Sequence, residues 1–167
     1  MSLLLKIAAC AGAVSLALAS PAALAYEPII SAADAHTLIH PSGVTDEVLA
    51  TGEQTDGQFS MIVLGGAKGA GPCKYIAHAK SAETFYVLEG QVRFFVNDKT
   101  IEGGPGTFVS VPATVRHGLE WLSDARILVT YSPPGYEHFF MDWDSKGLQP
   151  GPELGALEAH YGLTRSN

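Results

Sequence analysis

Short runs of alternating apolar and polar residues fill the middle of the chain, and turn-forming residues interrupt them at intervals of about 8 to 12 positions. This pattern is typical of a β-sandwich or β-barrel. Strands are predicted at Phe59 to Leu64, Lys74 to His78, Thr84 to Leu88, Val92 to Val96, Thr107 to Val111, Val115 to Trp121, Ile127 to Tyr131 and Tyr136 to Met141. These strands predict an all-β domain that is closed or nearly closed.

The connections agree with this prediction, because three of them are turn-forming clusters of hairpin length: Glu89-Gly90, Asn97-Asp98 and Gly103-Gly104-Pro105-Gly106. A single segment, near the C-terminus, has the period of a helix. It follows Pro152, its apolar positions Leu154, Leu157 and Tyr161 share one face, and Gly162 can end it. We therefore expect a short C-terminal helix packed on the strands.

The first 25 residues have the features of a secretory signal peptide. Lys6 precedes an apolar run from Ile7 to Ala19, and Ala23-Leu24-Ala25 is a small-x-small cleavage pattern. Two alternatives are weaker: Pro21 interrupts the run before it reaches the roughly 20 residues of a membrane span, and too few apolar residues precede Cys10 for a lipoprotein box. We expect a secreted or periplasmic protein with no membrane span in its mature form.

The mature chain divides into an N-terminal arm at 26–47, a barrel at 48–149 and a C-terminal helix and tail at 150–167. The arm has no sustained periodicity, so it is expected to be irregular or an edge strand, with His36 and His40 at the surface. Removal of the signal peptide leaves Cys73 as the one cysteine, so an internal disulfide is excluded.

Net charge excludes one class of partner. The chain has 10 Lys and Arg against 17 Asp and Glu, a formal charge of −7. Proteins that bind nucleic acid need clustered basic residues to neutralise phosphates. A nucleic-acid partner is therefore not expected.

Three residues on separate predicted strands have the chemistry of metal ligands. Alternation places His78 on the same strand face as Lys74 and Ile76. Glu83 follows five positions later, and His117 lies on a later strand. Two imidazoles and one carboxylate that converge inside a barrel could hold an ion such as iron, manganese or nickel, although each could also be an isolated polar residue.

The segment HAKSAETFYVLEG, from His78 to Gly90, resembles the first motif of the cupins, G(X)5HxH(X)4E(X)6G, in its second His, its Glu and its closing Gly. The second motif, G(X)5PxG(X)2H(X)3N, is matched at Gly106, Pro112 and His117. The resemblance extends from Gly52 to Phe140 and includes quercetin 2,3-dioxygenase-like proteins. It implies a cupin jelly-roll β-barrel that holds a metal and a small substrate.

The chain departs from both motifs at positions that bear on the metal. Ile76 stands where the first motif has its leading His, Trp121 replaces the closing Asn of the second, and Thr114 replaces its central Gly. The family's set of three His and one Glu is therefore reduced to His78, Glu83 and His117. The resemblance still implies a divalent metal ion, whose identity among Fe, Mn, Ni, Co, Cu and Zn the sequence leaves open.

The leading hypothesis is a metal-dependent dioxygenase that acts on a small oxygenated, flavonol-like or enolic substrate, with Glu83 both a ligand and the catalytic base. The candidate substrate-binding residues are Lys74, Ile76, Phe85 and Trp121. Lys74 could instead extend into solvent, and Trp121 could simply fill core volume.

Two other functions remain open: a non-catalytic cupin that binds a small ligand, and an isomerase or cyclase that uses the same three residues as acids and bases. One fold hosts many chemistries, so the fold cannot decide between them. The resemblance also implies a homodimer, in which the segment from Tyr26 to Asp46 could cross to the partner.

Overall fold

The structure is a computed structural model that describes residues 36–70 and 73–165 of the chain. The expected signal peptide lies outside these residues. The side chains of His36, Cys73 and Lys74 are likewise not described. Among the described residues, no helix is long and apolar enough to cross a membrane.

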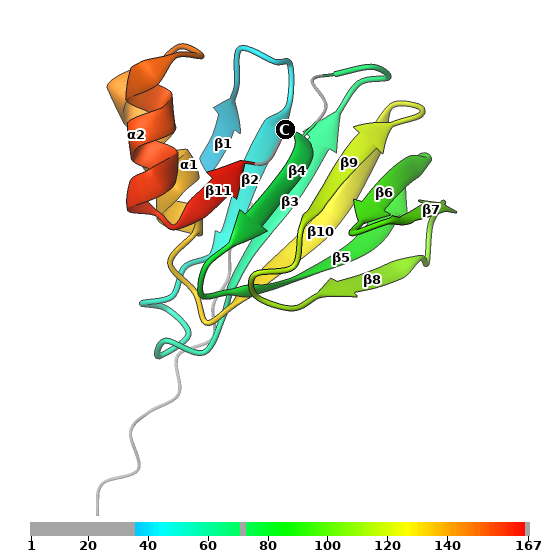
Figure 1. Cartoon of the computed structure of the whole chain (residues 1–167), viewed down its shortest axis with the longest axis horizontal. Coiled ribbons are helices and arrows are strands. Elements are labelled where there is room, and N and C mark those ends of the chain that lie inside the picture. The colour runs from blue at the N-terminus through cyan, green and yellow to red at the C-terminus, as the bar shows by residue number, and fades with distance from the viewer. Residues whose placement is uncertain (1–35, 71–72, 166–167) are drawn as a thin grey trace, which may run out of the picture.

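Two antiparallel sheets make up the body of the fold (Figure 1). The strands of the larger sheet, in spatial order, are β1 (His36–Ile39), β2 (Thr45–Ala50), β3 (Ser60–Gly66), β10 (Ala125–Ser132), β5 (Ala82–Glu89) and β8 (Phe108–Val111). Those of the smaller sheet are β11 (Leu163–Arg165), β4 (Cys73–His78), β9 (His117–Trp121), β6 (Val92–Val96) and β7 (Lys99–Gly103). Non-consecutive neighbours such as β3 and β10 are what a jelly roll requires.

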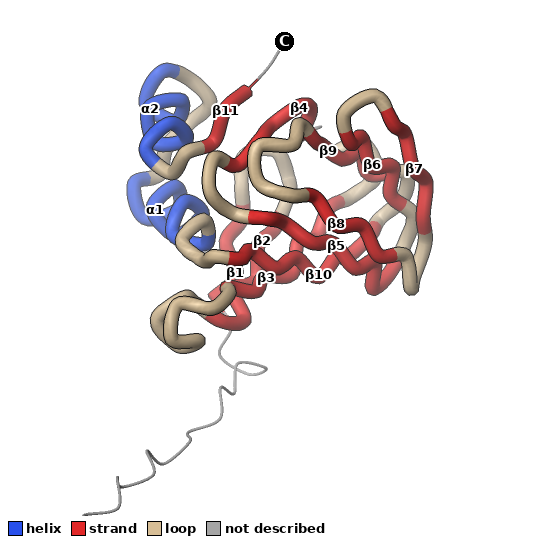
Figure 2. Tube along the Cα trace, turned by 60° about the horizontal axis from the view of Figure 1, so that its bottom comes forward, coloured by secondary structure: helices blue, strands red, loops and turns tan. Residues whose placement is uncertain are grey.

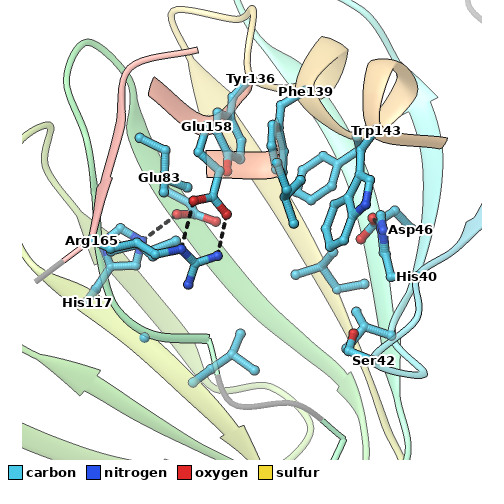
Figure 3. A pocket seen from close by; sticks show the side chains of 18 of the residues that line it. His40, Ser42, Asp46, Glu83, His117, Tyr136, Phe139, Trp143, Glu158 and Arg165 are labelled. Carbon is cyan, nitrogen blue, oxygen red and sulfur yellow. Dashed lines mark hydrogen bonds and ion pairs between the residues drawn. The ribbon is translucent and has the colours of Figure 1, made fainter. Parts of the chain in front are cut away.

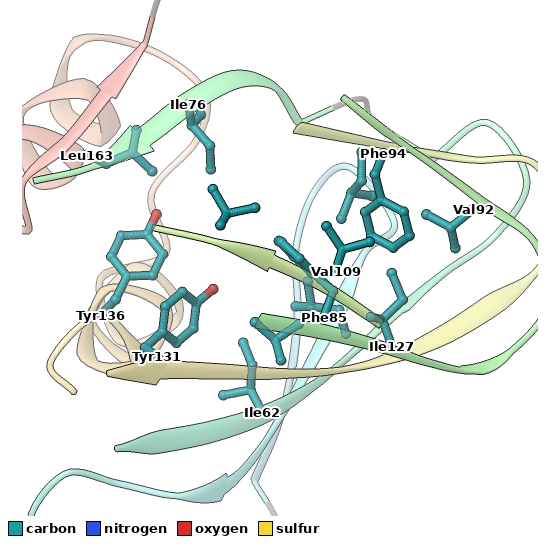
Figure 4. Close-up of a cluster of buried hydrophobic side chains, with 14 of the residues drawn as sticks. Ile62, Ile76, Phe85, Val92, Phe94, Val109, Ile127, Tyr131, Tyr136 and Leu163 are labelled. Atoms are coloured by element: carbon teal, nitrogen blue, oxygen red, sulfur yellow. The ribbon is translucent and has the colours of Figure 1, made fainter. Parts of the chain in front are cut away.

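The core lies between the two sheets, because alternate residues of each strand point inward. On β10, Ile127 and Val129 point into the core and are fully buried. Arg126, the residue before Ile127, points to the opposite face and is exposed. Figure 4 shows Phe85 and Ile127 of the larger sheet meeting Phe94 of the smaller one. The predicted all-β jelly roll is therefore confirmed, although its two sheets are not closed into a barrel.

Two helices pack beside one end of the sheets, next to β1 and β11 (Figures 1 and 2). They are α1 (Glu137–Lys146) and α2 (Pro152–His160). Helix α2 confirms the predicted C-terminal helix: Leu154 and Leu157 are buried, and Gly162 follows its end with a positive φ of 73°. Both helices contribute side chains to the core.

The prediction of a strand from Tyr136 to Met141 is wrong, because α1 occupies this segment. Tyr136, Phe139, Phe140 and Trp143 recur with the spacing of a helix face, and Phe139 is buried against the core. Local alternation in a short aromatic-rich segment cannot be told from helix periodicity until its packing partner is known.

The strand count and the degree of closure also differ from the prediction. Strands β2, β7 and β11 were not predicted, whereas β1, at the edge of the larger sheet, is the edge strand that the arm was expected to form as one of two alternatives. The described strands remain two separate sheets rather than a closed barrel. Of the three predicted turns, Asn97-Asp98 joins the paired strands β6 and β7, whereas Glu89-Gly90 and Gly103-Gly104-Pro105-Gly106 connect strands of different sheets. At Gly90, whose φ is 76°, a Cβ would lie 2.2 Å from the carbonyl oxygen of Asp124.

Candidate metal-binding site and its pocket

His78, Glu83 and His117 converge between the two sheets, as their positions in the sequence predicted. Nε2 of His78 lies 2.9 Å from Oε2 of Glu83, and Nε2 of His117 lies 2.7 Å from the same oxygen. Each of the three residues is only 3% exposed. The sequence therefore identified three buried polar residues whose nitrogen and oxygen atoms face one point.

Strand pairing explains why the three side chains meet. His117 begins β9 opposite Ile76 of β4, and His78 is two residues further along the same face of β4. Glu83 lies near the start of β5, which follows β4 after a short turn. The backbone N–H of Thr114, in the turn between β8 and β9, donates to the carbonyl oxygen of His78 at 2.8 Å, which holds that turn against the end of β4.

The charges in this cluster are set by mutual contacts. Burial alone would raise the pKa of Glu83, but the charge of His78 and hydrogen bonds from both imidazoles lower it to about 2. Burial alone would lower the pKa of His117, but the hydrogen bond and charge of Glu83 outweigh it and the pKa is raised. Glu83 is therefore a carboxylate at neutral pH.

The orientation of His117 suits a metal ligand. Its Nδ1–H donates to the carbonyl oxygen of Val115 at 2.9 Å, so its Nε2 is the atom directed at Glu83. Metal-binding histidines are commonly oriented in this way by a backbone carbonyl. Nδ1 of His78, in contrast, is buried with no hydrogen-bond partner in the described part of the chain.

The three residues fit a divalent cation. One ligand atom from each lies within 4.8 Å of the others, and two imidazoles with one carboxylate are the donors of facial metal sites with open positions. A cation would take the place of the protons that both Nε2 atoms share with Glu83. The donor set admits several first-row ions and does not select one of them.

A cavity of about 550 Å³ adjoins this cluster and is lined by Glu83 and His117. Three of the predicted substrate-binding residues, Ile76, Phe85 and Trp121, line it as well. Trp121 is 2% exposed and belongs to the core, so it both fills volume and forms a wall. The side chain of Lys74, the fourth candidate, is not described.

Several residues of this cavity were not predicted from the sequence. The prediction that His40 lies at the surface is wrong, because His40 is buried and contacts the buried carboxylate of Asp46. Both line the cavity, with aromatic side chains of α1 beside them (Figure 3). The turn Pro41-Ser42-Gly43 between two β segments was the signal, since a hairpin there places His40 and Asp46 on one face.

Tyrosines and one ion pair complete the lining. Tyr131 lies opposite Glu83 in the register of β10 and β5, and its hydroxyl group hydrogen-bonds the Glu83 carboxylate. Burial, together with that carboxylate, raises the pKa of Tyr131 well above its usual value. Arg165 pairs with Glu158 of α2, its Nε donating to Oε2 at 2.8 Å. Tyr131, Glu158 and Arg165 lie outside the two sequence motifs on which the prediction of the site rested.

Comparisons with known proteins agree with this fold. Residues 61–131 match the family model described as "Cupin domain". Over 94 residues the chain is 35% identical to quercetin 2,3-dioxygenase of Bacillus subtilis (strain 168), a match that covers 56% of this chain and 28% of that protein. The chain thus spans little more than a quarter of the length of this relative.

Solved structures with similar folds share less sequence. An RmlC-like cupin from Shewanella frigidimarina is 19% identical with a TM-score of 0.59, over 68% of this chain and 96% of that one. KdgF from Halomonas sp. is 17% identical with a TM-score of 0.53, covering 62% and 92%. The nucleoside dehydratase Pac13 of Streptomyces is 18% identical with a TM-score of 0.51, covering 62% and 80%. At these identities the likeness concerns the fold alone.

Proposed function

The chain carries a cupin domain at residues 61–131, and from this premise we propose that it is a metal-dependent oxygenase acting on a small enolic substrate. The observation that carries the proposal is the convergence of His78, Glu83 and His117, of which Glu83 and His117 line a largely apolar cavity. The partial match to a quercetin 2,3-dioxygenase supports the same reaction class.

In this proposal, His78, Glu83 and His117 hold the ion. A divalent ion there would supply a Lewis acid with open positions for the oxygen atoms of a substrate. The cavity volume of about 550 Å³ lies within the usual range of small-molecule pockets. Ile76 and Phe85 supply apolar surface beside the ion position, so a flat apolar substrate that packs on them can reach the ion and displace water from the cavity.

Glu83 is also the base of the proposed reaction. It is ionised at neutral pH and lies at the cavity wall, where it can accept a proton from a substrate hydroxyl group. Tyr131, hydrogen-bonded to Glu83, holds the carboxylate in position. After the proton transfer, the oxygen of Tyr131 can accept a hydrogen bond from the protonated Glu83.

Acid–base chemistry without a metal is the second candidate, an isomerase or cyclase. The direct contacts of both imidazoles with Oε2 of Glu83 favour it, because they form a buried proton-sharing network that needs no cation. A non-catalytic binding protein would use the same cavity and lacks a separate observation in its favour.

Oxygen consumption tests the proposed function. Protein loaded in turn with Fe(II), Mn(II), Ni(II), Co(II), Cu(II) or Zn(II) is mixed with a panel of flavonols and other enols, and dissolved oxygen is followed. We expect substrate-dependent oxygen uptake that His117→Ala abolishes. His160→Ala is the matched control, because His160 is exposed, does not line the cavity and belongs to no candidate metal-binding group of the described residues. Substrate turnover without oxygen uptake would favour the isomerase, and binding without turnover would favour the binding protein.

Export is part of the proposal, and its support is the signal-peptide pattern in residues 1–25. Expression of the full chain in a bacterial host followed by mass spectrometry of the periplasmic fraction tests it. We expect a mature protein that begins at Tyr26. Intact protein retained in the cytoplasm would contradict this proposal and leave the chemistry of the site unaffected.

A further inference from the structure

A second polar cluster lines the cavity away from the candidate metal ligands. Nε2 of His40 and Oδ2 of Asp46 form a hydrogen bond, with His40 5% exposed and Asp46 fully buried. His40 lies in the turn after β1 and Asp46 lies on β2 of the larger sheet. Both residues line the same cavity as Glu83 and His117, so one ligand can reach both clusters.

The Asp46 carboxylate has an acceptor atom to spare. Oδ2 contacts His40, whereas the buried Oδ1 has no hydrogen-bond partner in the described part of the chain. A buried acceptor without a partner is destabilising, so its presence here calls for an explanation. A ligand hydroxyl group that donates to Oδ1 would supply the missing hydrogen bond.

Aromatic side chains connect the two clusters. The Trp143 ring lies against His40, with ring centroids 4.1 Å apart, and Phe140 contacts the same imidazole at 5.8 Å. In Figure 3, Tyr136 and Phe139 lie between the Asp46 side of the cavity and the Glu83 side. The cavity thus has an aromatic middle and a polar group at either side, which suits a flat ligand with polar atoms at both ends.

We propose that His40 and Asp46 form a distal subsite that binds a hydroxyl group of the substrate. This hydroxyl group lies at the opposite end of the substrate from the oxygen atoms that face Glu83 and His117. Asp46 Oδ1 accepts the hydrogen bond from this hydroxyl group, and His40 holds the carboxylate in place through Oδ2 while Trp143 packs on its ring. This inference rests on the proposed function, since it deepens the substrate class to planar aromatic enols with a hydroxyl group on the distal ring.

The opposed shifts of the two groups are consistent with this subsite. Burial lowers the pKa of His40 to about 4, against the charge of Asp144, and burial raises the pKa of Asp46 well above its usual value. Both shifts favour a net-neutral pair that shares one proton. Such a pair can stay buried in an apolar cavity without a counter-ion, while Oδ1 remains an acceptor.

Calorimetric titration with matched probes tests the proposal. The probes are a flavonol with a hydroxyl group on its distal ring, the same flavonol without that group, and the methyl ether of the first. We expect wild-type protein to bind the hydroxylated probe about tenfold more tightly than either of the others, the ratio expected for a buried hydrogen bond to a polar partner. The ether cannot donate a hydrogen bond, so this comparison needs no variant.

Variants assign the preference to the subsite. Asp46→Leu should bind the three probes with similar affinity, whereas Asp142→Leu, which changes an exposed aspartate that does not line the cavity, should keep the tenfold preference. Glu83→Gln should lose oxygen uptake and keep the preference, which separates this inference from the proposed function. Equal binding of the probes by wild-type protein, no binding of any of them, or a preference retained in Asp46→Leu would overturn the subsite.

Discussion

Ile76 lies directly opposite His117 in the register of β4 and β9. It is 7% exposed and faces the cavity, two residues before His78 on the same strand face (Figure 4). The position that resembles a metal-binding histidine in the first motif therefore holds an apolar side chain beside two retained ligands. The residue at position 76 therefore determines whether the candidate metal site has three protein ligands or four.

Restoring an imidazole at this position should strengthen the site. In Ile76→His the new side chain faces the cavity next to His78 and His117, and we expect at least a tenfold gain in metal affinity, or about 1.4 kcal/mol. Thermal melts of the wild type and the variant, with and without Fe(II), Mn(II) or Ni(II), measure it. Ile76→Val controls for the loss of packing.

The same melts can contradict the account. If metal stabilises Ile76→His and leaves the wild type unchanged, the natural protein works without a metal and the oxygenase proposal is abandoned. If metal stabilises neither protein, Ile76 belongs to an apolar pocket, and the buried imidazole should cost about 1 to 3 kcal/mol of stability.

Gly66 and Trp121 should be energetically coupled. A Cβ on Gly66 would lie 2.4 Å from the Trp121 indole ring, so Gly66→Ala must displace a side chain that lines the cavity. We expect a loss of about 1 to 3 kcal/mol in urea unfolding, reduced in the double variant with Trp121→Leu. Gly155→Ala is the control, since a Cβ there meets nothing within 4 Å and should not destabilise the helix. Additive losses would contradict the predicted contact.

The pair of His40 and Asp46 predicts a pH dependence of stability. Between about pH 4 and 6.5 the folded His40 binds fewer protons than the unfolded one, while folded Asp46 binds more, so their effects oppose each other. Above pH 6.5 unfolded His40 is neutral and only Asp46 contributes. The folded state then keeps a proton that the unfolded chain has lost, and the free energy of unfolding falls as pH rises until Asp46 ionises.

Asp46→Asn isolates this effect. The variant retains only the His40 contribution, which makes its stability rise from about pH 4 to 6.5 and level off above. The unfolding free energy of the wild type minus that of the variant should therefore decrease steadily with pH, by at most about 1.4 kcal/mol per unit. Urea unfolding from pH 4 to 8 measures it. A difference that stays constant or grows with pH would show that the pair is not neutral in the folded protein.

Much of the metal cluster could be predicted from the sequence because its residues lie on strands that are paired or consecutive: β9 pairs with β4, and β5 follows β4 along the chain. The four residues between His78 and Glu83 span the end of one strand and the start of the next, and alternation fixes which face each side chain occupies. The hydrogen bond from Tyr131 to Glu83 could not be predicted in the same way. It depends on the pairing register of β5 and β10, which strand periodicity does not determine.

The distal side of the cavity escaped prediction for a different reason. His40 is buried because Trp143 and Phe140 of α1 pack against it, and α1 was predicted as a strand. A polar residue in a segment of weak periodicity has no local signal of burial, since the side chains that cover it come from about a hundred positions away in the sequence.

A homodimer remains a prediction, and the structure suggests where to test it. Phe108 and Tyr86 face each other across β8 and β5 and are 62% and 44% exposed, a paired apolar surface at one edge of the larger sheet. Light scattering at micromolar concentration should give the mass of two chains, and Phe108→Glu should shift the protein toward the monomer. A wild-type monomer would contradict the prediction.

The claim that His78, Glu83 and His117 hold a divalent ion is tested most directly by the metal content of purified protein. Elemental analysis is made on wild type, Glu83→Gln and the control His160→Ala, purified without added metal and again after loading and desalting; His160 is exposed and belongs to no candidate metal-binding group of the described residues. We predict a single first-row ion per chain in wild type and His160→Ala, and an affinity at least about 10 to 100 times weaker in Glu83→Gln. Wild-type protein that retains no ion even after loading, or an ion that remains in Glu83→Gln at full occupancy and affinity, would contradict it.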